Sequence, residues 1–117
     1  MNVKNFMSYI PRTSIDSSAL TSSYQPINPN GTSGSCWTFD IINNSTSDID
    51  VSFNGSTDHD FIPANSIKII DIQTNSQPNN DINLMKKGQI VYVKGSAGTG
   101  IIYLVGRTNT ITNIAGL

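Results

Sequence analysis

The stretch Gln89–Gly106, QIVYVKGSAGTGIIYLVG, holds the two most hydrophobic segments of the chain. Ile90–Val93 and Ile101–Val105 are rich in β-branched and aromatic residues, which suit the pleated, half-buried surface of a strand. Between them lies Lys94–Gly100, KGSAGTG, whose glycines adopt positive φ without steric cost and so allow the chain to reverse. The pattern predicts a β-hairpin at the centre of a sheet, with the rest of the chain packed on this pair of strands.

The composition predicts a single all-β domain. The chain has 117 residues, which is close to the commonest domain size. Ile, Val, Thr, Ser and Asn predominate, whereas Leu and Ala are few and all eight acidic residues are aspartates. Strand and turn formers therefore outnumber helix formers.

Charge and cysteine content exclude several classes of function. The net charge of -1 gives no electrostatic argument for binding nucleic acid, which calls for a basic patch. The single cysteine, Cys36, excludes an internal disulfide and a cysteine-based zinc cluster. No apolar run approaches the ~20 residues that span a bilayer, and the first residues lack the hydrophobic region of a signal peptide. We therefore expect no specific nucleic acid partner, no membrane association and synthesis in a cytoplasm.

Strand signals are regular from Cys36 onward. In Asp48–Asn54, apolar and polar residues alternate, as expected for an antiparallel strand with one solvated face. Ser66–Gln73, which contains IKIIDI, is apolar on both faces and is predicted to be an interior strand. Six to seven strands at this spacing predict a small antiparallel β-sandwich or jelly-roll-like barrel. Further strands are expected at Cys36–Ile42 and His59–Pro63, and a short strand or helical turn at Ile82–Met85.

The chain divides by composition into an extended N-terminal arm (1–35), a β-sandwich domain (36–108) and a C-terminal tail (109–117). In the arm, apolar residues occur singly and neither the helical nor the strand period persists. Such a segment is either a solvated tail or an arm that becomes ordered on a neighbouring subunit. In the second case deletion of the arm leaves folding intact and prevents assembly. The residues expected at that subunit interface are Phe6, Tyr9, Ile10, Arg12, Ile15 and Tyr24.

The glycine-rich segment does not fit a phosphate-binding loop. Gly95 and Gly100 have the required separation, but Gly100 is not followed by Lys and Ser or Thr. The segment that follows is also predicted to be a strand, so no helix N-terminus is available to bind an anion. We therefore expect no nucleotide site.

No other residues form a recognisable catalytic or metal site. Asp58-His59-Asp60 is the cluster that contains the single histidine, and alternation in a strand points His59 away from both aspartates. Cys36 at the start of a strand is typical of a small buried hydrophobic residue rather than a nucleophile. We expect a protein that is not an enzyme, with no catalytic residues, no metal and no cofactor.

The order of several segments resembles a group of small β-sandwich structural proteins from the virions of tailed bacteriophages. The segments are SYQPINPNG, NNSTSDIDVSFNGSTDHDFIPANS, IIDIQTN and KKGQIVYVKGSAGTGIIYLVG, and together they cover about residues 24–106. Asn54 stands where the group carries Asp, so no acid-dependent role is carried over for that loop. The matching positions are Asn44, Ser45, Val51, Ser52, Phe53, Asn54, Gly55, Asp58, His59, Lys87, Gly88, Val93, Lys94, Gly95, Gly98, Gly100 and Tyr103.

The resemblance implies a virion protein, made in the cytoplasm of a bacterial host, that contacts copies of itself and portal, tail or capsid subunits. A long arm suits a ring, in which the terminus of each subunit lies on its neighbour, so a neck, connector or tail ring is favoured. A collar or capsid decoration protein is the alternative within the same class. An alternative from another class is a carbohydrate-binding or receptor-binding module that uses Trp37, Tyr92 and Tyr103.

Overall fold

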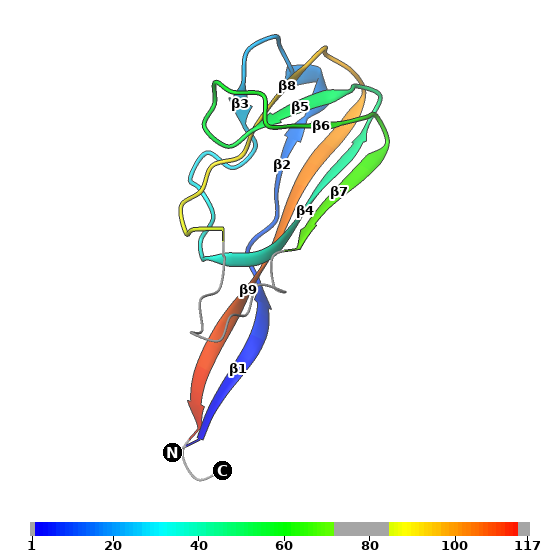
Figure 1. Cartoon of the computed structure of the whole chain (residues 1–117). Helices are drawn as coiled ribbons and strands as arrows, with labels where there is room; N and C mark the ends of the chain where they lie inside the picture. The colour runs from blue at the N-terminus through cyan, green and yellow to red at the C-terminus, as the bar shows by residue number, and fades with distance from the viewer. Residues whose placement is uncertain (1, 72–84, 115–117) are drawn as a thin grey trace.

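A computed structural model of the chain describes residues 2–71 and 85–114, and it shows two antiparallel sheets packed face to face (Figure 1). This confirms the predicted all-β sandwich. The described residues form nine strands, more than the six to seven expected. Their one helical element, η1 (Ser17–Ala19), is far too short to cross a membrane. The strands are β1 (Asn2–Tyr9), β2 (Thr13–Asp16), β3 (Gln25–Pro26), β4 (Cys36–Ser45), β5 (Ile49–Ser52), β6 (Asp60–Ile62), β7 (Ser66–Asp71), β8 (Tyr92–Gly95) and β9 (Gly100–Ile114).

The two predicted central strands are central, but they do not form a hairpin. In the first sheet, here called sheet A, the order is β1-β9-β4-β7, and β2 also pairs with β9. In sheet B the order is β3-β8-β5-β6. Because β8 and β9 belong to different sheets, the glycine-rich segment between them carries the chain across the sandwich.

The glycines of this segment are required by a close approach to the connection between β4 and β5. A Cβ atom on Gly98 would collide with the Ser47 side chain, and one on Gly100 would collide with the Asn44 carbonyl. The Thr46 N–H donates to the Thr99 carbonyl at 2.9 Å, so the two connections are bonded side by side. The hairpin prediction was wrong because these glycines are required by contact with the β4–β5 connection, about fifty residues away in the sequence, and not by a local turn.

Among the described residues, four connections cross between the sheets at the end of the sandwich opposite the termini (Figure 1): β2 to β3, β4 to β5, β6 to β7 and β8 to β9. The buried amide of Asn43 donates to the carbonyls of Ser47 at 2.8 Å, Ile62 at 3.3 Å and Pro63 at 3.0 Å. Ser45 donates its hydroxyl hydrogen to Asn43 Oδ1 at 2.5 Å. Asn43 thus ties the β4–β5 and β6–β7 connections together.

The hydrophobic core lies between the two sheets and draws on both of them. Phe53, just after β5, is half-buried and packs edge-on against Phe39, with ring centroids 6.1 Å apart. The core residues are Leu20, Ile27, Phe39, Ile41, Ile49, Val51, Ile62, Val91, Val93, Ile102 and Leu104.

The N-terminal segment is part of the sandwich rather than a separate arm. β1 and β2 pair with β9, and β3 pairs with β8. Leu20 and Ile27 are 3% and 1% exposed and belong to the core. The division at residue 35 was wrong because β9, fifteen residues long, offers an edge on which two short strands bond one after the other.

The predicted C-terminal tail is also largely strand. Residues 109–114 continue β9 and pair with β1 over Asn2–Met7, forming a two-stranded ribbon that extends beyond the sandwich (Figure 1). The prediction for Ile82–Met85 falls outside the described residues except at Met85, which forms a bridge with Cys36.

β7 is an edge strand, so the prediction of an interior strand was wrong. Within the described residues it pairs with β4 alone. Ile70 packs against the core, whereas Ile67 and Ile69 point to the opposite side and are 61% and 65% exposed. A strand of a two-layer sandwich buries one face, and the second apolar face of IKIIDI therefore lies on the surface.

Because the N-terminal segment supplies strands and core, we expect deletion of residues 1–24 to abolish cooperative thermal unfolding, contrary to the expectation for an independent arm. The deletion removes β1, β2 and Leu20. Leu20→Ala alone should cost about 2–5 kcal/mol, whereas Ser22→Ala, at an exposed neighbour, should change stability by less than about 0.5 kcal/mol. Circular dichroism melts of the three variants test this, and a truncated chain that melted like the full one would contradict it.

Substitution of Asn43 should be among the most destabilising polar changes. Asn43→Ala leaves the Pro63 carbonyl without its amide donor, at about 1–3 kcal/mol, and leaves the Ser47 carbonyl with only the longer bond from the Ser45 hydroxyl at 3.3 Å. Asn44→Ala, at an exposed neighbouring position, is the matched control and should be nearly neutral. Chemical denaturation measures both free energies of unfolding. Equal effects would show that the β4–β5 and β6–β7 connections do not depend on this amide.

Candidate interaction surfaces

The outer side of sheet A carries an exposed apolar surface, here called the A face. Ile102 and Leu104 of β9 point into the core, so Tyr103 and Val105 point outward. Ile42 lies opposite both Tyr103 and Ile67 in the sheet. The A face consists of Met7, Tyr9, Arg12, Ile42, Ile67, Ile69, Tyr103 and Val105.

A groove of about 430 Å³ lies on the A face and is walled by apolar side chains of three strands. At its rim the guanidinium of Arg12 lies 4.9 Å from the ring centroid of Tyr103, a cation–π contact. Arg12 is exposed and makes no ion pair in the part of the chain that the structure describes. The A face therefore carries an uncompensated positive charge next to its groove.

Arg107, the other arginine, is neutralised. Its guanidinium donates to both carboxylate oxygens of Asp40, at 2.8 and 3.3 Å, and to the Thr38 hydroxyl at 2.9 Å. It also lies 5.4 Å from the ring centroid of Tyr9. The hydrogen bonds with Asp40 raise the pKa of Arg107 above its ordinary value. This cluster fixes the base of the β1–β9 ribbon to sheet A.

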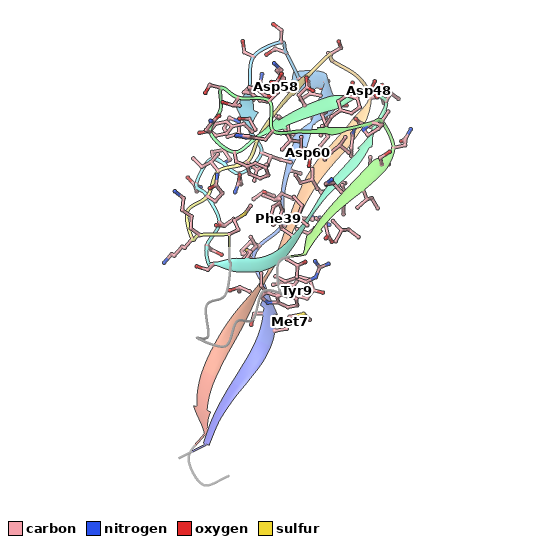
Figure 2. The ribbon with its side chains drawn as sticks, viewed as in Figure 1. Met7, Tyr9, Phe39, Asp48, Asp58 and Asp60 are labelled. Atoms are coloured by element: carbon pink, nitrogen blue, oxygen red, sulfur yellow. The ribbon has the colours of Figure 1, made fainter. Side chains whose placement is uncertain are left out.

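The outer side of sheet B carries a second exposed surface, here called the B face. Phe61 of β6 is 53% exposed and lies opposite Asp50 of β5, which in turn lies opposite Lys94 of β8. These residues and Asp48 line an open groove of about 640 Å³. Figure 2 shows Asp48, Asp58 and Asp60 gathered at the end of the sandwich away from the termini.

Lys94 does not neutralise the carboxylates of this groove, because it is bonded elsewhere. Its Nζ lies 3.1 Å from Asp58 Oδ1 and 4.7 Å from the ring centroid of Tyr24. The Tyr24 hydroxyl donates to Asp58, and this bond is the main cause that lowers the pKa of the Asp58 carboxyl. Burial, followed by the bond to Asp58, raises the pKa of Tyr24. Asp48 and Asp50 therefore give the B face a negative charge beside Phe61.

The six predicted interface residues do not share one surface. Tyr9 and Arg12 lie on the A face, and Tyr24 lies beside the B face. Ile10 is 9% exposed and packs near Gly106, and Ile15 packs against the core. The side chain of Phe6 is outside the described residues. Their contact with a neighbouring subunit stays a prediction.

The sequence patterns did not predict the exposure of four large hydrophobic side chains, each more than half exposed: Met7, Phe61, Ile67 and Ile69. For Ile67 and Ile69, the sequence signal that could have indicated exposure was the second apolar face of the segment IKIIDI. Apolar residues at both faces of one strand exceed what a two-layer sandwich buries, so they indicate either an interior position or a surface that another molecule covers.

The residues considered for chemistry have structural partners. His59 Nδ1 accepts the Phe53 N–H at 2.9 Å, and Cys36 is buried, which raises the pKa of its thiol. Among residues 2–71 and 85–114, no three His, Cys, Asp or Glu side chains are grouped to hold a metal ion. The aromatics considered for sugar binding are also dispersed: Tyr103 is on the A face, whereas Tyr92 of sheet B packs against Gly55.

Comparison with known proteins identifies a phage structural neighbour. No protein-family model matches the chain, and no curated protein matches its sequence. A solved structure that it resembles is the SPP1 Dit (gp 19.1) protein, described as a paradigm of the hub adsorption apparatus in phages that infect Gram-positive bacteria. The identity is 16% and the TM-score 0.41 over 87% of this chain, which spans about half (49%) of the Dit protein.

The Arg107–Asp40 pair should stabilise the fold more than the other ion pairs do. Its side chains are only 23% and 12% exposed, so Asp40→Asn leaves a half-buried cation without its charged partner. We expect a loss of about 1–3 kcal/mol in the free energy of unfolding. Asp60→Asn, which breaks the more exposed pair with Lys68, is the control and should cost less than about 1 kcal/mol. Equal losses in urea denaturation would contradict this assignment.

Proposed function

We propose that the protein is a non-enzymatic structural component of a tailed-bacteriophage virion that acts through contacts between subunits, in a neck, connector or tail ring. Its location is then the virion, and its partners are copies of itself and adjoining portal, tail or capsid proteins. The order of the sequence motifs supports the class of particle.

The observation that carries the assembly role is the exposure of five large hydrophobic side chains: Met7, Tyr9, Phe61, Ile67 and Ile69, each 53–65% exposed. Soluble monomers rarely leave extended apolar patches open, and such patches mark interaction sites. Aromatic residues, Met and Arg, which are all present on the A face, are the residue types enriched in protein interfaces. The outward Ile67 and Ile69 also lie on an edge strand, where unprotected backbone pairs readily with another chain.

A capsid decoration protein is the second candidate, because the same surfaces also suit binding to a capsid lattice. The location of the protein in a map of the particle separates the two. Density at the head–tail junction or on the tail supports the ring, and density spread over the capsid supports decoration.

The double variant Ile67→Ser, Ile69→Ser tests the assembly role. Both side chains are exposed, so the variant should fold, yet its copy number in purified virions should fall at least about tenfold. Quantitative mass spectrometry of gradient-purified particles measures this number. The matched control is Lys68→Ser, on the same strand but facing Asp60, which should be incorporated normally. Absence of the wild-type chain from virions, or normal incorporation of the double variant, would overturn the proposal.

A further inference from the structure

We infer that the A face of one copy binds the B face of the next, with Phe61 entering the A-face groove and Asp50 pairing with Arg12. The inference deepens the proposed ring, on which it rests, by naming the two surfaces that meet. The partner is a second copy of this chain.

The two faces lie on opposite sides of the molecule. Ile41 and Leu104 of sheet A and Ile49 and Val93 of sheet B meet in one core, so the outer sides of the sheets point away from each other. Each copy therefore offers one face to each of two neighbours. A contact between two different surfaces, repeated by rotation, generates a closed ring, or a helical array when the rotation does not close.

The A face carries a groove, and the B face carries an exposed aromatic ring. The groove, of about 430 Å³, is lined by Ile42, Ile67 and Tyr103 and, at its other side, by polar residues that include Asn44, Asn65 and Ser66. The B face presents the Phe61 ring, 53% exposed, at the margin of its own groove. An aromatic ring that fills an apolar pocket is the usual centre of an interface, and its burial removes apolar area on both partners from water.

The charges of the two faces are complementary as well, and they select a second copy in this orientation. Arg12 lies at the rim of the A-face groove and forms no ion pair with the residues that the structure describes. Asp48 and Asp50 flank Phe61, while the nearby cation, Lys94, is bonded to Asp58. A two-fold contact of either face with itself would oppose like charges, whereas the A face against the B face opposes arginine to carboxylate. Such complementarity specifies partner and register.

A charge reversal tests the contact in the full chain. Sedimentation velocity over a range of concentrations should show self-association of the wild type. Arg12→Asp and Asp50→Arg should each raise the dissociation constant by about tenfold or more, and the double variant should recover most of the association. Phe61→Ser should weaken it without a change of charge. Lys86→Asp, an equal reversal at an exposed turn outside both faces, is the control and should behave as the wild type.

Circular dichroism verifies that each variant is folded, as expected for substitutions at exposed or half-exposed positions. A wild type that stays monomeric at all concentrations, single variants that associate normally, or a double variant as weak as the single ones would each overturn the contact. A monomeric chain that is nevertheless found in virions would overturn this contact alone. Association in solution by a chain absent from virions would overturn the proposed function alone.

Discussion

The buried amide of Asn43 is the interaction on which the two-sheet arrangement depends. Where a chain leaves one sheet for the other, its carbonyls leave the ladder of backbone bonds, and a buried carbonyl without a donor is costly. The two amide hydrogens of Asn43 are shared among three carbonyls, two of them in the β4–β5 and β6–β7 connections and one at the end of β6. The β2–β3 and β8–β9 connections are bonded to each other through Ser17, whose carbonyl accepts the Gly98 N–H at 3.1 Å and whose hydroxyl donates to the Gly100 carbonyl at 2.8 Å. A side chain without polar hydrogens could not bond the carbonyls of these connections.

Local pattern predicted strands within the segments Cys36–Ile42, Asp48–Asn54, His59–Pro63 and Ser66–Gln73, because alternation is a property of a few consecutive residues. In Asp48–Asn54 it correctly placed Ile49 and Val51 in the core. It did not predict pairing, which depends on distant segments. KGSAGTG satisfies every local rule for a hairpin, yet Gly98 and Gly100 are required by the turn near Ser47. Both strands were therefore predicted correctly, but their pairing with each other in one hairpin was not.

In the N-terminal segment, local pattern failed to predict strands that pair with distant parts of the chain. Ile10, Leu20 and Ile27 come from three short segments, and each fills a different place in the sandwich. No period is visible, because a period needs several inward residues in one element. Of the residues on the two candidate surfaces, the sequence predicted only some. Tyr9 and Arg12 lie in a segment without helical or strand periodicity, so they were predicted to contact another subunit. Phe61 lies in a predicted strand, where nothing in the sequence distinguishes an exposed from a buried aromatic residue.

The exposed edge of sheet A separates the residues that stabilise the fold from those available for the proposed contacts. Natural edge strands are shielded by charges, and on β7 Lys68, paired with Asp60 at 3.5 Å, is the one charge among the described side chains of that strand. Ile67 and Ile69 point to the opposite face of the strand from Lys68, onto the A face, and are 61% and 65% exposed. Their cost in water is offset once another molecule covers them, and no residue of the core has to be exposed for binding. In the proposed function, this surface is the one that neighbouring subunits cover.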